Sequence, residues 1–135
     1  MKLRDLYAEF VGGYHGVDTG HDHVGFSRLG DRVVDGVQGI LFQCPKCAEG
    51  LERGEETDED GTVRHFVRGA HSILCWFTNP VNAERVPDDA DPKPGRWTFS
   101  GTSIDDITFI GPAAASVLLT GGCGWHGFVN NGEAA

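Results

Sequence analysis

The sequence QCPKC at residues 43–47 and the sequence CGWH at residues 123–126 each place two potential metal ligands three positions apart. A Cys-x-x-Cys turn directs both sulfurs toward one point, and a Cys-x-x-His turn has the same spacing. Three thiolates and one imidazole are a typical ligand set for structural zinc. The sequence therefore predicts a Zn²⁺ site formed by Cys44, Cys47, Cys123 and His126.

This ligand set would join two distant parts of the chain, because the first pair follows an expected early strand and the second lies near the C-terminus. Glycines surround Cys123, and without Cβ atoms they would let the backbone pass close to an ion. Four protein ligands leave no position for water or substrate. The pattern therefore favours a structural zinc over a catalytic one, and no catalytic residue is predicted.

Two further residues could replace a ligand. His71 and Cys75 lie four positions apart on an expected strand, so both would point to the same face. Core packing is the more common role of a residue such as Cys75, since a free cysteine behaves as a small hydrophobic residue. A simpler alternative also stays open, in which Cys44 and Cys47 are reduced thiols in a loop and His126 is a surface residue.

The segments around these motifs predict a mostly β fold of small antiparallel sheets held together by zinc. Residues 36–43, 71–77, 96–101, 105–111, 115–122 and 124–132 carry the aromatic and β-branched residues of short strands. Alternation along residues 71–77 predicts two faces. One face holds Ile73, Cys75 and Phe77, and the other holds Leu74 and Trp76.

Two segments differ from this β pattern. Residues 2–12 carry apolar residues at helical spacing, which predicts one short N-terminal α-helix. Residues 48–64 are acidic and turn-rich without apolar periodicity, which predicts a mobile loop or hairpin tip. No repeat or second domain is visible, so residues 1–135 are expected to form a single zinc-binding β domain.

Charge and composition narrow the classes of partner. The chain has 20 acidic and 11 basic residues and a net charge of −9. Such a surface disfavours direct binding to nucleic acid or to an anionic membrane. No apolar run approaches the ~20 residues of a membrane span, and the N-terminus does not resemble a signal peptide. A cytoplasmic location follows as the expectation, and reduced thiols there favour metal binding over disulfides.

A second candidate site is the sequence HGVDTGHDH at residues 15–23. His15, His21 and His23, with the aspartates between them, could hold a metal ion in a hydrolytic site. Nothing in the sequence fixes their geometry, and a solvated loop is the simpler interpretation. The alternative function is thus a metal-dependent, hydrolase-like enzyme that uses this loop or an open zinc, although the sequence favours a non-enzyme.

A third hypothesis is an acidic mimic of nucleic acid. The acidic residues Glu55, Glu56, Asp58 and Glu59 would face a basic protein partner in this case. Salt-sensitive binding to that partner would be the expected signature.

Together, these segments resemble a family of small actinobacteriophage and prophage proteins that is catalogued as a domain of unknown function. Some members are labelled "ammonia monooxygenase". The resemblance covers about residues 37–133 and departs at residues 110–116, where many relatives carry Ser-Pro-Ser. The residues that match its motifs are Cys44, Cys47, Trp97, Phe99, Gly101, Thr108, Phe109, Cys123, His126, Phe128, Val129, Asn131 and Gly132.

This resemblance implies a phage-encoded, zinc-binding and mostly β protein. The leading hypothesis for its function is a zinc-stabilised binding or structural protein. It would be either a virion component or a factor that contacts a host protein in the host cytoplasm during infection. A homo-oligomer is compatible with either role.

Overall fold

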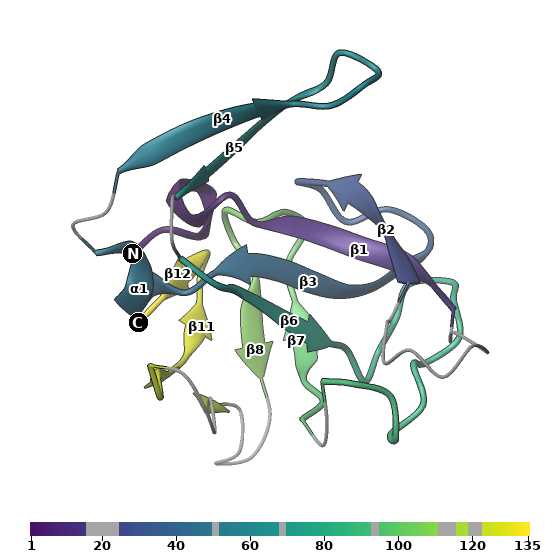
Figure 1. Cartoon of the computed structure of the whole chain (residues 1–135). Coiled ribbons are helices and arrows are strands. Elements are labelled where there is room, and N and C mark those ends of the chain that lie inside the picture. Colours follow the sequence, from purple (N-terminus) through teal and green to yellow (C-terminus); the bar gives the residue numbers. More distant parts are fainter. Residues whose placement is uncertain (16–24, 50–51, 68–69, 93–94, 111–115, 119–122) are drawn as a thin grey trace.

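The computed structural model describes residues 1–15, 25–49, 52–67, 70–92, 95–110, 116–118 and 123–135 (Figure 1). The fold is mostly β and is built from small antiparallel sheets, as predicted. Its elements are η1 (Leu3–Leu6), β1 (Glu9–His15), β2 (Gly25–Gly30), β3 (Val37–Gln43), α1 (Pro45–Ala48), β4 (Arg53–Thr57), β5 (Val63–Val67), β6 (Ser72–Trp76), β7 (Thr98–Ser100), β8 (Thr108–Ile110), β9 (Val117–Leu118), β10 (His126–Gly127), β11 (Val129–Asn130) and β12 (Glu133–Ala134).

A four-stranded antiparallel sheet with the order β2-β1-β3-β6 forms the centre of the molecule. Its two middle strands are rich in apolar residues, and Ile40 of β3 pairs with Phe10 on one side and with Cys75 on the other. These three side chains are fully buried. The other described strands pair in twos, as β4-β5, β7-β8, β9-β10 and β11-β12.

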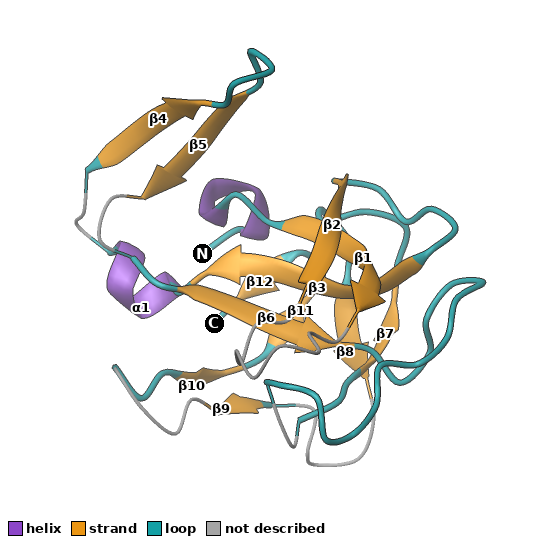
Figure 2. Cartoon of the chain, turned by 45° about the vertical axis from the view of Figure 1, so that its right-hand side comes forward, coloured by secondary structure: helices purple, strands orange, loops and turns teal. Residues whose placement is uncertain are grey.

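The main core lies on one face of this sheet. Figures 1 and 2 place β7 and β8 on that side, away from the β4-β5 hairpin. The rings of Phe77 and Phe99 stack with centroids 4.2 Å apart, and Phe10 and Phe109 lie within 6.5 Å of Phe77. The predicted alternation is confirmed, because Ile73, Cys75 and Phe77 all belong to this core.

The opposite face of the sheet holds a smaller cluster. Trp76 is fully buried there against Val11 of β1 and Val86 of the long connection between β6 and β7. Gln38 joins the same connection to the sheet, since its side-chain amide donates to the carbonyl of Glu84 over 2.8 Å. The predicted position of Leu74 and Trp76 on this second face is confirmed.

The predicted short N-terminal helix is present as the 3-10 turn η1, but it covers Leu3–Leu6 and does not extend to residue 12 as expected. A single 3-10 turn ends at Tyr7, which adopts a left-handed conformation with φ of 53°, and β1 begins two residues later. Phe10 and Val11 are both fully buried, but in clusters on opposite faces of the sheet. The apolar spacing thus reflects a strand covered on both sides, where tertiary packing overrides a helical pattern.

Backbone hydrogen bonds join the two ends of the chain. The N–H of Ala134 donates to the carbonyl of Met1 over 2.9 Å, and the N–H of Leu3 donates to the carbonyl of Gly132 over 2.8 Å. Val129 and Ala134 are buried. The last described strands are therefore attached to the body by pairing and burial.

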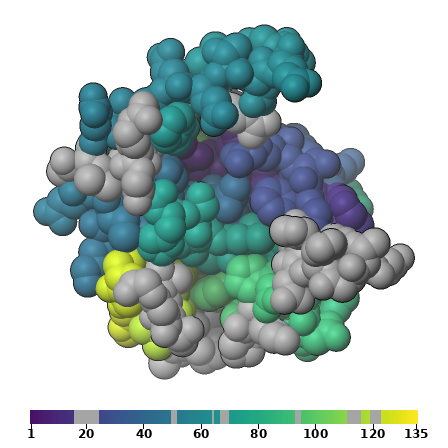
Figure 3. All heavy atoms as spheres, viewed as in Figure 1, coloured from purple at the N-terminus to yellow at the C-terminus, as the bar shows by residue number. Residues whose placement is uncertain are grey.

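The acidic segment over residues 48–64, predicted as a mobile loop or hairpin tip, is part of a hairpin. It begins in α1, continues through β4, and returns as β5, with Glu55 paired to His65 across the hairpin. Figure 3 shows this hairpin at the top of the molecule with a hollow beneath it. Its mobility stays a prediction. Among the described residues, no helix is long and apolar enough to cross a membrane.

Candidate metal centre

The antiparallel pairing of β3 and β6 brings the first ligands together. Gln43 at the end of β3 pairs with Ser72 at the start of β6. The next residues outward are Cys44 and His71, and the N–H of Cys44 donates to the carbonyl of His71 over 2.9 Å. Cys47 follows one helical turn later in α1. Sheet register therefore places a histidine beside the Cys-x-x-Cys turn.

Cys123 completes a group of four from the other end of the chain. One ligand atom from each of Cys44, Cys47, His71 and Cys123 lies within 4.8 Å of all the others. The Sγ atoms of Cys44 and Cys123 are 3.4 Å apart, and Nε2 of His71 is 3.3 Å from Sγ of Cys123. Sulfurs bound to one tetrahedral zinc are about 3.8 Å apart, so the group has suitable dimensions.

The thiols of Cys44 and Cys123 differ in acidity. Burial, as the largest effect, raises the pKa of Cys44 to about 11. The hydrogen bond with His71, followed by that with Cys44, lowers the pKa of Cys123 to about 6. Burial thus favours the protonated form of Cys44, and the hydrogen bonds favour the thiolate form of Cys123. A bound cation would displace the remaining proton, since metals bind the thiolate form.

A lysine fixes the approach of the last ligand. Nζ of Lys46 in α1 donates to the carbonyl of Cys123 over 2.9 Å. Trp125, two residues further on, is buried and meets the ring of Phe42 edge-on at 6.2 Å. The segment that carries Cys123 is therefore attached to α1 at the cysteine itself and to the end of β3 through Trp125.

The structure does not bring His126, the fourth ligand preferred from the sequence, into this group. Its side chain is exposed on β10, and its ring lies 6.2 Å from that of Phe128. The neighbouring Trp125 faces inward, and consecutive residues of an extended chain point to opposite sides. His71, predicted as a substitute, occupies the corresponding place.

Cys75, the other predicted substitute, lies outside the group. It is fully buried in the main core, and burial raises the pKa of its thiol. Cross-strand register could have identified His71, since it becomes the neighbour of Cys44 once β3 and β6 are paired. Spacing within each motif carries no such information.

The second predicted metal site falls mostly outside the described residues. His21 and His23 belong to residues 16–24, and only His15 is described. The His15 side chain is exposed, and its Nδ1 lies 3.2 Å from the carbonyl oxygen of Gly13. The hypothesis of a metal-dependent enzyme at this loop stays a prediction.

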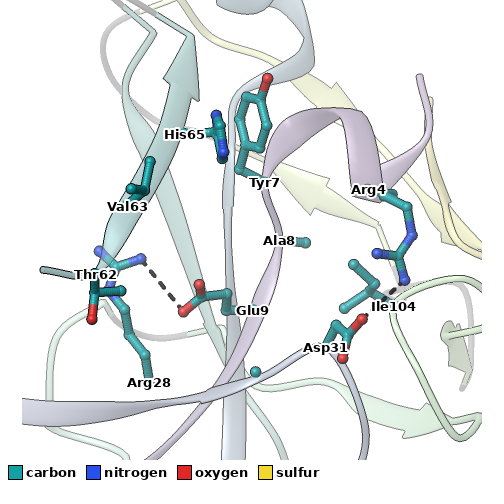
Figure 4. A pocket seen from close by; sticks show the side chains of 11 residues that line it. Arg4, Tyr7, Ala8, Glu9, Arg28, Asp31, Thr62, Val63, His65 and Ile104 are labelled. Atoms are coloured by element: carbon teal, nitrogen blue, oxygen red, sulfur yellow. Dashed lines mark hydrogen bonds and ion pairs between the residues drawn. The ribbon is translucent and has the colours of Figure 1, made fainter. Parts of the chain in front are cut away.

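A hollow of about 530 Å³, lined by both charged and apolar side chains, lies between the hairpin and the edge of the central sheet (Figure 4). Arg4 forms an ion pair with Asp31 at 3.1 Å on one side of it. On the other side Arg28 approaches Glu9 at 3.7 Å. These opposite charges are paired within the protein, and the hollow contains none of the four side chains of the metal group.

Interactions of His65 and Arg53 hold the β4-β5 hairpin above this hollow. The rings of Tyr7 and His65 stack with centroids 6.0 Å apart. Nη1 of Arg53 donates to the hydroxyl of Tyr7 over 2.7 Å and to the carbonyl of Asp5 over 2.9 Å. The hairpin is thus attached to the body at its side, as well as through its base next to the metal group.

The chain matches no protein-family model, no curated protein and no solved structure. The site is therefore interpreted from its own residues. The resemblance to the phage family stays a prediction.

Proposed function

We propose that the protein binds one Zn²⁺ ion through Cys44, Cys47, His71 and Cys123, and that this ion is structural. The observation that carries this proposal is the convergence of three sulfurs and one imidazole nitrogen within 4.8 Å. Soft thiolate ligands favour zinc over magnesium or calcium. A set of three cysteines and one histidine fills the tetrahedral positions of the ion, so none remains for substrate.

The ion would connect residues from four positions along the chain. Cys47 precedes the β4-β5 hairpin and His71 follows it, so these two ligands mark the base of the hairpin. Cys44 ends a central strand, and Cys123 begins the C-terminal segment. A single ion would therefore fix the hairpin and the Cys123 segment relative to the central sheet.

We further propose that the zinc-stabilised protein acts by binding another protein, as a phage accessory factor in the host cytoplasm or as part of the virion. Two observations support this role, namely the set of four converging ligands and the net charge of −9, and the resemblance to the phage family implies it. Purified virions of the encoding phage would contain the chain if it is structural. Its absence from virions would favour an intracellular partner.

Metal content measured by plasma mass spectrometry tests the site. The wild-type protein should contain one zinc per chain after dialysis. His71→Ala and Cys123→Ser should lose the metal or bind it at least tenfold more weakly, because a ligand is missing. His126→Ala is the matched control, since this histidine lies on the same C-terminal segment but outside the group.

Measurement of metal content can also contradict the proposed ligand set. Loss of zinc in His126→Ala with retention in His71→Ala would restore the ligand set preferred from the sequence. A wild-type protein without metal, even after refolding with zinc, would leave four reduced thiols and no metal centre. Cobalt substitution gives an independent readout, because tetrahedral Co²⁺ with thiolate ligands absorbs strongly in the visible range.

A further inference from the structure

Two of the converging thiols are close enough to react with each other. The Sγ atoms of Cys44 and Cys123 lie 3.4 Å apart, although the residues are 79 positions apart in the chain. We propose that this pair is a site of oxidative modification, at which a hydroperoxide forms a Cys44–Cys123 disulfide that is incompatible with metal binding. The metal-release part of this proposal rests on the proposed function, whereas formation of the disulfide does not.

Accessibility assigns different roles to the two sulfurs. Cys44 is fully buried, whereas Cys123 is partly exposed. A small oxidant in solution therefore reaches Cys123 first, and Cys44 acts as the resolving thiol from beneath it. Cys75 is also fully buried but lies in the main core, outside the group. It provides an internal control that should stay reduced.

The chemistry involves two displacement steps. The Cys123 thiolate attacks hydrogen peroxide, so that an S–O bond forms, the O–O bond breaks and hydroxide leaves. Cys44 then loses its proton as its sulfur attacks the sulfur of the resulting sulfenic acid, so that the S–S bond forms and the S–O bond breaks. The second hydroxide leaves, and the hydroxides take up protons as water. The two sulfurs lose two electrons in total, and the peroxide gains them.

The disulfide and the metal exclude each other. A disulfide bond is about 2.05 Å long, so the two sulfurs need to approach by only about 1.4 Å. Both would then be lost as thiolate ligands. Cys47 and His71 would remain, and two ligands do not make a structural zinc site. Oxidation should therefore release the metal, and reduction should restore its site.

Replacement of the metal by the disulfide would affect the β4-β5 hairpin more than the segment that carries Cys123. The disulfide keeps the end of β3 joined to the segment that begins at Cys123. Cys47 and His71 lose their common ligand, and they are the residues at the base of the β4-β5 hairpin. Oxidation is thus expected to loosen the β4-β5 hairpin above the hollow while the C-terminal segment stays attached.

The test begins with the zinc-loaded full chain and hydrogen peroxide. A chromophoric chelator follows zinc release, and peptide mapping without reduction locates the disulfide. We expect one zinc released per chain, a Cys44–Cys123 disulfide, and recovery of zinc binding after a phosphine reductant. Cys47→Ser should still form this disulfide, Cys75→Ser should behave as wild type, and Cys123→Ser should form none. Hydrogen exchange should accelerate in residues 53–67 of the oxidised protein.

Other results would overturn the proposal. A Cys44–Cys47 disulfide as the main product would assign the reaction to the wrong pair, and sulfinic acid at Cys123 without any disulfide would exclude Cys44 as the resolving thiol. The metal-free protein separates the two proposals. If the chain never binds zinc but maps a Cys44–Cys123 disulfide, the zinc proposal fails and the disulfide stands. Zinc binding without this disulfide gives the reverse result.

Discussion

The aromatic core beneath the central sheet and the group of Cys44, Cys47, His71 and Cys123 both join distant segments, but by different physical means. The core joins β1, β6 and β7 through side chains that exclude water, such as Phe77. The group of four side chains brings strand ends together through atoms that could hold a metal ion. The first region is complete without a ligand, whereas we propose that the second binds one.

The C-terminus shows this difference most clearly. A metal site that includes Cys123 suggests that the chain end depends on coordination. The final strands are nevertheless paired with the N-terminus through the backbone of Met1, Leu3, Gly132 and Ala134. Dependence on the metal should therefore end soon after Cys123, and it should be strongest at the hairpin on the other side of the group.

The largest expected effect is a change in the core. Phe77→Ala should lower the free energy of unfolding by about 3–5 kcal/mol, because a fully buried ring that stacks on Phe99 is removed. Urea denaturation measures this loss, with excess zinc and again with a chelator. The two losses should agree, since separated sites contribute independently.

Phe128→Ala is the matched control for Phe77→Ala, because its ring is 53% exposed. It should change the free energy of unfolding by no more than about 0.5 kcal/mol. A loss at Phe77 that appears only with zinc would break the comparison, since the core would then depend on the metal. Equal losses at Phe77 and Phe128 would also contradict it.

Removal of the metal should have the next largest effect. Zinc held a thousandfold above its dissociation constant stabilises the folded chain by about 4 kcal/mol, and a chelator removes that contribution. The metal-free chain should stay folded, because its core needs no ligand. Hydrogen exchange should therefore increase in residues 52–67 and around Cys123 but change little in β1 and β3. Complete unfolding by the chelator would show that the metal group governs the whole fold.

Short-range patterns in the sequence predict part of the core and three of the four residues in the metal group. The strand around Ile73 and Cys75 was predicted with both of its faces, because alternation is a property of neighbouring residues. Cys44, Cys47 and Cys123 were grouped through their spacing and residue type, and the structure brings these three together. Both predictions needed only short-range patterns.

The predictions that failed or changed depended on pairing between distant segments. The spacing at Phe10 and Val11 indicated a helix, but covering on both faces of β1 produces the same apolar pattern. His71 ranked below His126 because it has no motif partner within three positions. Its place beside Cys44 follows from the register of β3 against β6, which sequence spacing does not encode.

The smallest expected effect concerns Arg53, whose side chain joins the β4-β5 hairpin to Tyr7 and Asp5. Arg53→Met removes two hydrogen bonds and the guanidinium 5.3 Å above the Tyr7 ring, while it keeps a long apolar side chain. The free energy of unfolding should change by about 0.5 kcal/mol or less, because the contact is exposed. Limited proteolysis within residues 53–67 should accelerate nonetheless, since local opening needs fewer broken contacts.

Arg85→Met is the control for this variant, as it removes an exposed ion pair with Asp88 elsewhere on the molecule. Its proteolysis within the hairpin should match that of the wild type. The effect of Arg53→Met should be larger after chelation, because the hairpin then loses its attachment at the base as well as at the side. Equal effects with and without zinc would mean that the metal does not hold the base of the hairpin, which would confine its role to the Cys123 segment.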